Sequence, residues 1–247
     1  CTIRRHYNSN QGGVELKSAV IGLGETGGPL FEILQEHYGN DVEGYDIKTT
    51  PLIKILPHDI EVLNITIPYS DKFLDIINVY QDLFNPSLVI VHSTVPIGTT
   101  RQIPNAVHSP ILGRHDRMKE DLKTFKKWIG GEKVEEARNY LQRAGFYCEC
   151  VSTSEETEAL KLMCLAKYGM SIAFAQYCKD IADIYKFPYD DVARWDVNYN
   201  VGVDEWLQRP ILNPPNGKIR GHCVCQNTKI LNQQHPNLIL QEVLKYE

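Results

Sequence analysis

The feature that most constrains this chain is a glycine-rich turn between a short apolar run and a helical pattern. The run spans Ser18 to Ile21, and Gly22, Gly24 and Gly27 follow it in G-x-G-x-x-G spacing within GLGETG. The first glycine of such a unit allows a tight turn after a strand, and the second lets the backbone approach a pyrophosphate. The third lets the next helix pack closely on the sheet, with its free N–H groups and positive dipole end toward the phosphates. The turn therefore predicts a dinucleotide site.

An acidic residue at suitable spacing strengthens this prediction. Asp46 lies 22 residues beyond Gly24, at the end of the next strand pattern. A carboxylate there hydrogen-bonds the ribose hydroxyls and repels a 2′-phosphate, which favours NAD over NADP, although Lys48 can soften that preference. The alternative is a surface glycine cluster beside an unrelated Asp. We expect the cofactor to contact Asp46 and the whole turn, which comprises Gly22, Leu23, Gly24, Glu25, Thr26 and Gly27.

Downstream, apolar strand-like runs alternate with helical patterns. Strands are expected over residues 62–68, 88–96, 105–112 and 147–151, and helices over about 71–84, 117–128 and 132–144. Such alternation predicts an α/β fold with a Rossmann-type, mostly parallel sheet, and near-continuous apolar runs suit a sheet covered on both faces. Ligands bind outside the carboxyl ends of such strands. The cofactor is therefore also expected to contact Ile67, Pro68, Ser93 and Thr94.

From Ser154 the pattern becomes one long helix that ends near Phe187, before Pro188. About 33 residues at 1.5 Å each span roughly 50 Å, too long for one small domain to cover. We therefore expect a homodimer through the 154–187 helix; a pair of helices hinged near Gly169 is the alternative. The apolar stripe expected to meet the partner and the core comprises Leu160, Leu162, Met163, Ile172, Phe174 and Ile181.

A shorter helical segment is expected over about 190–207, followed by a Pro-rich loop over 209–227. The change of texture at Ser154 predicts two domains. Residues 1–153 are expected to form an NAD-binding Rossmann domain, and residues 154–247 a helical substrate and dimerisation domain.

Composition excludes several other classes of protein. The 26 basic and 31 acidic residues are mixed along the chain and give a formal charge of −5, so a nucleic-acid partner is not expected. No apolar stretch approaches the roughly 18 residues that a membrane helix needs. Seven cysteines, an odd number, and the lack of a basic-then-apolar leader favour free thiols and a cytoplasmic location. The C-x-C pairs Cys148/Cys150 and Cys223/Cys225 have no accompanying His pair, so no metal site is expected.

Four motifs together resemble a known family. They are GLGETG, STVPIGTT (93–100), ETEALKLMCLAKYGMSIAF (156–174) and GKIRGHCVCQNTK (217–229). Their order and spacing are similar to those of the UDP-glucose/GDP-mannose dehydrogenase family, within the 6-phosphogluconate dehydrogenase-like superfamily, over most of residues 17–231. The resemblance implies a Rossmann-type domain before a long dimerisation helix. It also implies NAD-dependent oxidation of a sugar-nucleotide alcohol to a carboxylate, through a thiohemiacetal and a thioester on a loop cysteine.

The same resemblance assigns catalytic residues. Cys223 matches the nucleophile, Lys161 matches the helix lysine that holds the substrate oxygen, and Thr94 matches a strand-end threonine near the nicotinamide. A thiolate attacks an aldehyde readily, and nearby positive charge from Lys218, Arg220 or His222 would favour it. The alternatives are a buried apolar cysteine, a solvated lysine and a threonine that caps a strand.

The departures from the family pattern leave the reaction open. Leu165 and Asn227 stand where the family has a substrate-binding asparagine and an aspartate, and HSPILGRH (108–115) lacks the family's glutamate. His108 or His115 could accept a proton instead, or be structural. The chain ends 24 residues after Cys223, so the family's third domain is expected to be absent. The open hypotheses are a sugar-nucleotide dehydrogenase, a single-step β-hydroxyacid or 6-phosphogluconate-type dehydrogenase, and a catalytically inactive NAD-binding module.

Overall fold

The computed structural model describes residues 16–49, 58–215, 217–219 and 223–247, which form two compact units. The first unit comprises the described residues up to Ser93 together with Ile103–Ser152. The second comprises Thr94–Gln102 and the described residues from Thr153 onward. Two residues that were expected to supply positive charge near Cys223, Arg220 and His222, lie outside the described residues.

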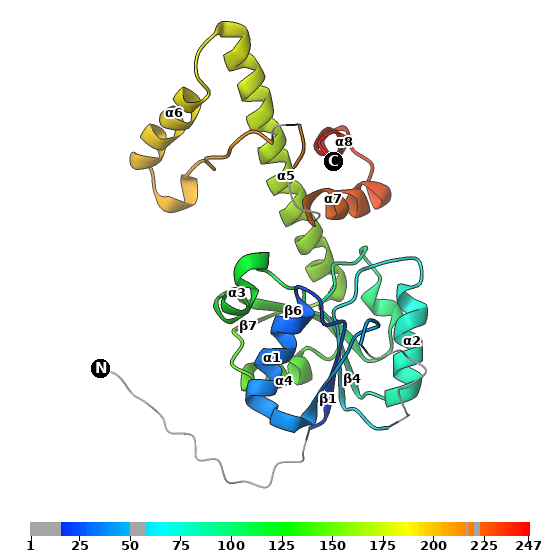
Figure 1. Cartoon of the computed structure of the whole chain (residues 1–247). Helices are drawn as coiled ribbons and strands as arrows, with labels where there is room; N and C mark the ends of the chain where they lie inside the picture. Colours follow the sequence, from blue (N-terminus) through cyan, green and yellow to red (C-terminus); the bar gives the residue numbers. More distant parts are fainter. Residues whose placement is uncertain (1–15, 50–57, 216, 220–222) are drawn as a thin grey trace, which may run out of the picture. The chain divides into compact units, whose positions relative to one another are not determined.

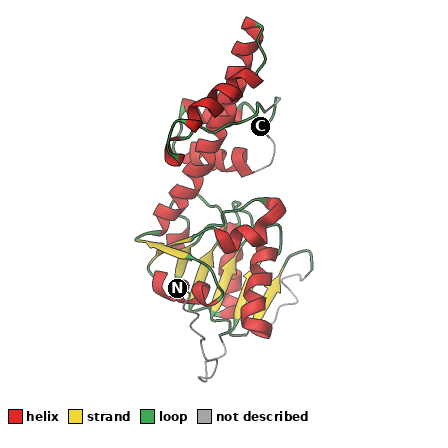
Figure 2. Cartoon of the chain, turned by 90° about the vertical axis from the view of Figure 1, so that its left-hand side faces the viewer, coloured by secondary structure: helices red, strands yellow, loops and turns green. Residues whose placement is uncertain are grey.

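The first unit is built on a seven-stranded sheet with the order β2-β1-β3-β4-β5-β6-β7, drawn in yellow in Figure 2. All neighbouring strands are parallel except β5 and β6, so the predicted mostly parallel α/β sheet is confirmed. The order places β1 between β2 and β3, where the strand order reverses and ligands of such sheets bind. The strands are β1 (Ser18–Ile21), β2 (Val42–Tyr45), β3 (Val62–Ile65), β4 (Leu88–Val91), β5 (Ala106–His108), β6 (Lys127–Gly131) and β7 (Cys148–Val151).

Helices cover both faces of the sheet, as the near-continuous apolar strands predict. Buried side chains of α1 (Gly27–Tyr38), α3 (Met118–Thr124) and α4 (Val134–Arg143) share one core cluster with alternate strand residues such as Val20 and Ile90. Helix α2 (Phe73–Phe84) lies on the other side of the sheet (Figure 1). The central strands β1, β3 and β4 are buried along their whole length, so the sheet forms a rigid base for the loops at its carboxyl edge.

The expected helix over 117–128 is wrong in its second half. Helix α3 ends at Thr124, and residues from Lys127 form β6 instead. This strand pairs parallel to β7 and antiparallel to β5. The local hydrophobicity pattern does not report such pairing between distant segments. Lys127 also argued against a strand in the sequence, because a lysine is not expected at a buried strand position.

A buried polar network crosses the sheet beneath its carboxyl edge. Lys127 is 2% exposed, and its Nζ donates to the carbonyl oxygens of Ser109 at 2.6 Å and Pro110 at 3.2 Å. The same ammonium lies 3.0 Å from Nδ1 of His92, whose Nε2 lies 3.1 Å from Oδ1 of Asn64. Burial, followed by the charge of Lys127, holds the pKa of His92 well below its ordinary value, so the imidazole is neutral. The network ties β6 to the ends of β3, β4 and β5.

The second unit is helical and begins with α5 (Ser154–Tyr185). The side chain of Thr153 caps this helix by accepting from the N–H of Glu156 at 3.2 Å. The C-cap Lys186 adopts a left-handed conformation with φ +60°, and Pro188 follows, so α5 ends where the sequence predicted. The unit continues with η3 (Thr100–Gln102), α6 (Asp190–Val201), η5 (Glu205–Leu207), α7 (Cys223–Gln234) and α8 (Leu238–Leu244).

The alternative of two helices hinged at Gly169 is wrong, because α5 is a single helix of 32 residues. A Cβ at Gly169 would lie 2.7 Å from Cγ1 of Val224 and 2.7 Å from Cγ1 of Val243. The glycine therefore lets α7 and α8 pack against α5, as Figure 1 shows, and serves close contact rather than bending. The segment expected as a loop around Cys223 is also a helix from that residue onward. Among the described residues, none of the helices has the length and apolar character needed to cross a bilayer.

The buried network generates a prediction about stability. Replacing Lys127 with Met removes the donor that satisfies the Ser109 and Pro110 carbonyls, so the free energy of unfolding should fall by about 2–4 kcal/mol. Lys126→Met is the matched control: that lysine is exposed and pairs with Glu149, and its loss should cost under about 0.5 kcal/mol. Urea unfolding monitored by circular dichroism measures both. Equal midpoints for the two variants would contradict the role given to Lys127.

Candidate functional site

The glycine-rich turn leaves the carboxyl end of β1 in a conformation that only glycine adopts easily. Gly22 has φ +94°, and its N–H donates to the carbonyl oxygen of Tyr45 at 2.7 Å, which joins the turn to β2. A Cβ at this position would lie 2.9 Å from Cγ2 of Ile67. The first glycine of the motif is thus required both by the backbone conformation and by the close approach of the loop after β3.

The other two motif glycines have opposite surroundings. A Cβ at Gly27 would lie 1.8 Å from the carbonyl oxygen of Gly22, so α1 rests directly on the turn. A Cβ at Gly24 would have no atom within 4 Å, so the backbone there borders open space. Helix α1 has no side-chain cap at Thr26 and no acidic residue in its first turn. An open backbone at a positive helix end that lacks a capping side chain fits a bound phosphate group.

Thr66, which the sequence analysis did not identify as a site residue, supports the glycine-rich turn from the end of β3. Its hydroxyl oxygen lies 2.8 Å from the carbonyl oxygen of Ile21 and 2.6 Å from that of Gly22. A Cβ at Gly27 would also lie 2.3 Å from this hydroxyl. Thr66 follows β3 directly, so the parallel ladder carries it to the end of β1. The sequence feature that could have identified Thr66 is its position one residue before Ile67, at a predicted strand end.

Asp46 lies beside the turn, as its spacing predicted. Its Oδ2 accepts from the N–H of Leu23 at 2.9 Å, and its Oδ1 accepts from the N–H of Lys48 at 2.9 Å. These hydrogen bonds, the one from Lys48 first, lower the pKa of Asp46, so the carboxylate is charged at neutral pH. Each carboxylate oxygen can accept a further hydrogen bond. The residue therefore fixes the turn and keeps acceptors for a ligand hydroxyl.

Contacts from side chains to backbone carbonyls also join the ends of the neighbouring strands. The hydroxyl of Ser93 donates to the carbonyl oxygen of Ile67 at 2.6 Å, while Pro68 beside it is exposed. His108 is fully buried, and its Nε2 lies 3.1 Å from the carbonyl oxygen of Ser93. These contacts favour the structural alternative for His108. His115, the other histidine considered as a proton acceptor, forms an ion pair with Glu25 at 2.7 Å.

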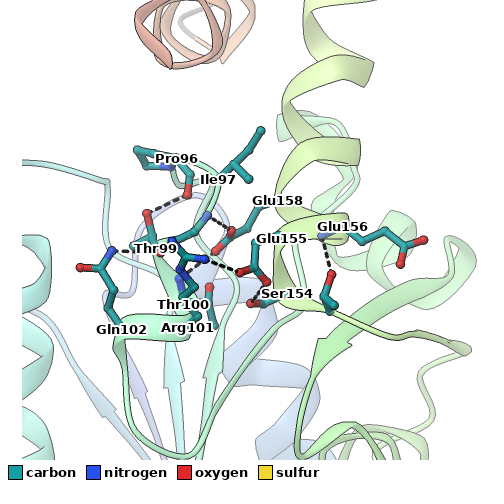
Figure 3. A network of polar contacts seen from close by, with 12 residues as sticks. Pro96, Ile97, Thr99, Thr100, Arg101, Gln102, Ser154, Glu155, Glu156 and Glu158 are labelled. Atoms are coloured by element: carbon teal, nitrogen blue, oxygen red, sulfur yellow. Dashed lines mark hydrogen bonds and ion pairs between the residues drawn. The ribbon is translucent and has the colours of Figure 1, made fainter. Parts of the chain in front are cut away.

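In the second unit, a buried carboxylate holds the turn that follows Thr94. Oε2 of Glu158 accepts from the N–H of Gly98 at 2.6 Å, and its Oε1 accepts from the N–H of Thr100 at 2.8 Å (Figure 3). Burial is the largest influence on this carboxyl and raises its pKa, while the hydrogen bonds oppose the rise. From α7, the amide of Gln234 donates to the carbonyl oxygen of Ile97 and accepts from its N–H. The half-buried Thr94 thus begins a turn held by α5 and α7.

Lys161 and Cys223 influence each other within the second unit. Lys161 is half-buried one helical turn after Glu158, and Cys223 is the first residue of α7, which packs on α5. Burial lowers the pKa of Lys161, and the negative charge that a Cys223 thiolate would carry is the largest opposing influence. Cys223 also lies at the positive end of the α7 dipole. The helical position that sequence analysis missed therefore adds a second source of thiolate stabilisation.

Two departures from the family pattern lie on the same helices. Leu165 is half-buried on α5 one turn after Lys161, and Asn227 is 7% exposed on α7 one turn after Cys223. Cys225 is 4% exposed, and burial raises the pKa of its thiol. Of the two cysteines in this C-x-C pair, Cys223 is the one with the less buried thiol. The structure thus supports the choice of Cys223 over Cys225 as the reactive thiol.

Comparison with known proteins identifies the fold. No family model matches the chain, and no curated protein matches it in sequence. UDP-D-ManNAc dehydrogenase from Pyrococcus horikoshii has a similar structure: the TM-score is 0.77 at 20% identity, over 93% of this chain and 68% of that one. UDP-glucose dehydrogenase from Pyrobaculum islandicum gives 0.73 at 18% identity, over 97% of this chain and 69% of that one. Mycobacterium tuberculosis 3-hydroxyisobutyrate dehydrogenase gives 0.68 at 14% identity, over 93% and 91%. The resemblance to UDP-sugar dehydrogenases is therefore confirmed at the level of the fold.

The contrast between Gly27 and Gly24 gives a prediction about the turn. Gly27→Ala forces α1 away from Gly22 and should lower the free energy of unfolding by about 1–3 kcal/mol or more. Gly24→Ala places a methyl group in open space and should change it by less than about 0.5 kcal/mol. Thermal unfolding of the two variants measures the difference. A Gly27→Ala protein as stable as the Gly24→Ala protein would contradict the close packing of α1 on the turn.

Proposed function

We propose that this chain is an NAD-dependent oxidoreductase that oxidises the alcohol of a sugar nucleotide or a related sugar. The observation that carries the proposal is that Lys161 is half-buried on α5 and that Cys223 begins α7, the helix that packs on α5. A lysine with a lowered pKa and a thiol at a helix N-terminus are the two groups that oxidation through an aldehyde requires. The fold it shares with UDP-sugar dehydrogenases supports the same reaction class.

The first unit supplies the residues that would hold the cofactor. The open backbone at Gly24 and the uncapped start of α1 would receive the diphosphate. The Asp46 carboxylate would accept from the ribose hydroxyls and repel a 2′-phosphate, which favours NAD. Bound NAD would supply the acceptor for the two electrons and the hydrogen removed from the alcohol carbon. Ile67, Ser93 and Thr94 remain proposed contacts at the strand ends.

The second unit supplies the residues that would act on the substrate. Lys161 would donate a hydrogen bond to the substrate oxygen and stabilise negative charge as it develops there. The Cys223 thiolate would add to the carbonyl carbon of an aldehyde, forming a sulfur–carbon bond while the carbonyl electron pair moves to the oxygen. Thr94 would help to position the reacting groups from the turn that Glu158 holds. Because Leu165 and Asn227 replace an amide and a carboxylate of the family pattern, the final oxidation state is left open.

A second candidate function has its own support. The chain spans 91% of the 3-hydroxyisobutyrate dehydrogenase from Mycobacterium tuberculosis, compared with 68% of the UDP-D-ManNAc dehydrogenase. A single-step oxidation of a hydroxy acid would use the helix lysine and would not need a thiol nucleophile. The role of Cys223 therefore separates the two candidates.

The test is cofactor reduction with purified protein, NAD and a panel of sugar nucleotides and hydroxy acids. We expect reduced cofactor with a sugar nucleotide, and a loss of roughly 100-fold or more in turnover for Lys161→Met. Cys223→Ser should abolish the reaction or stop it at the aldehyde, whereas a variant that still reduces NAD with a hydroxy acid favours the single-step candidate. Cys164→Ser is the matched control, since that exposed cysteine lies on α5 one turn beyond Lys161. Saturable NAD binding without turnover on any donor would instead indicate an inactive module.

The expected homodimer through α5 is also part of this proposal. The second unit contains a cavity of about 1040 Å³ on the C-terminal half of α5, walled by α6, α8 and residues 209–212. Its lining includes Phe174, Tyr177 and Ile239, whose side chains are 64%, 56% and 53% exposed. Exposed apolar surface of this extent marks an interaction site. At roughly 48 Å, the 32-residue α5 is much longer than α7 and α8, the helices of 12 and 7 residues that pack on it, so we propose that a second copy covers the rest.

Sedimentation velocity tests the homodimer. Phe174→Glu places a charge on the proposed interface and should shift the protein toward the monomer, because a desolvated unpaired charge is costly. Val79→Glu is the control: Val79 is an exposed apolar residue on α2 in the other unit, and its replacement should leave the dimer intact. A wild-type protein that sediments as a monomer at micromolar concentration would rule out the dimer.

A further inference from the structure

A row of ion pairs joins the start of the fold to a segment about ninety residues later in the first unit. Its acids come from the glycine-rich turn and α1, and its bases come from η4 (His115–Arg117) and α3 at intervals of four residues. The pairs are Glu25–His115 at 2.7 Å, Glu32–Lys119 at 2.6 Å, Glu36–Lys119 at 2.9 Å and Glu36–Lys123 at 2.9 Å. All of these side chains are partly exposed, so each pair adds little to stability. The row instead fixes the position of the 115–123 segment along α1.

The first pair differs from the others because it lies in the phosphate-binding turn. Glu25 stands between Gly24, where the backbone borders open space, and Gly27, where α1 begins. A carboxylate at this point would repel a bound diphosphate, since like charges a few ångströms apart oppose each other even near solvent. His115 holds the Glu25 carboxylate from outside the motif. The 2.7 Å contact between Nδ1 of His115 and the Glu25 carboxylate offsets the negative charge of Glu25 beside the turn.

The two arginines near His115 both contact Asp121. On the same segment, the backbone N–H and Nε of Arg114 donate to Oδ2 of Asp121, and Nε of Arg117 lies 3.5 Å from its Oδ1. These contacts, with that from the Arg114 N–H first, lower the pKa of Asp121, so the carboxylate is charged and contacts both arginines. His115 instead contacts Glu25, the acid of the glycine-rich turn.

We propose that His115 is a positioning residue that, through Glu25, sets the affinity of the glycine-rich turn for the diphosphate of a dinucleotide. The inference rests on the proposed function, because it assumes that NAD binds at this turn. Glu25 then contributes backbone to the cofactor, while its side chain is kept neutralised by His115. A residue that no motif search of the turn would include thus becomes part of the cofactor site.

Calorimetric titration with NAD tests the proposal through a mutant cycle. His115→Ala should weaken binding roughly two- to tenfold, as expected for an uncompensated acid at a helix N-terminus that holds an anion. His115→Lys should retain the affinity, because it restores a positive charge. The double variant Glu25→Gln/His115→Ala should regain the affinity, since the repulsion has been removed. The loss in His115→Ala should shrink at high salt, which screens the charges.

Lys123→Ala is the matched control, because it breaks an ion pair of the same row away from the turn and should leave NAD affinity unchanged. The inference is overturned if His115→Ala binds NAD as tightly as the wild type, or if the double variant is as weak as His115→Ala. A wild-type protein that takes up no NAD overturns the proposed function, and this inference with it. A wild type that binds NAD alongside an unaffected His115→Ala variant overturns the inference alone.

Discussion

The structure of the first unit depends on one close contact, that of α1 with the turn after β1. At Gly27 the helix approaches the carbonyl oxygen of Gly22 so closely that a Cβ would lie 1.8 Å from it. Thr66 fixes that carbonyl from β3. The contact brings the positive end of α1 to the point where the strand order reverses, with open space at Gly24. Without it, the same strands would still form a sheet, but the helix end would no longer meet the sheet at the ligand-binding edge.

In the second unit, a carboxylate and a glycine of α5 hold a turn and a neighbouring helix in place. Glu158 fixes the 96–100 turn from α5 through two backbone N–H groups. Gly169, three turns along the same helix, lets α7 approach until Val224 packs against the backbone. These two contacts determine where α7 begins, and so where Cys223 and its helix dipole lie relative to Lys161. The contact of Gly169 with Val224, the residue after Cys223, thus helps to place the thiol.

Sequence reasoning predicted the parts of this fold that local rules dictate. The spacing of Gly22, Gly24 and Gly27, the parallel order of the central strands and the end of α5 before Pro188 all follow from backbone conformation or periodicity. It missed β6, because Lys127 is held in the core by two carbonyls of the loop after β5. It also missed that Cys223 begins a helix. Thr66 and the Glu25–His115 pair were equally out of reach, since each joins residues more than forty positions apart.

The acids near the two candidate sites share a structural role that affects the proposed chemistry. Asp46, Glu158 and Asp121 each accept hydrogen bonds from backbone N–H groups and hold a loop in place. Asp46 and Asp121 are poor proton acceptors, because their hydrogen bonds lower the pKa and accepting a proton would release the loop, whereas burial raises the pKa of Glu158. His92 is neutral and buried in the core network. In the proposed function, Lys161, whose pKa burial lowers, would be the group that exchanges a proton with a bound alcohol. A Cys223 thiolate would oppose this lowering, so the proposed nucleophile would also influence the protonation state of the lysine.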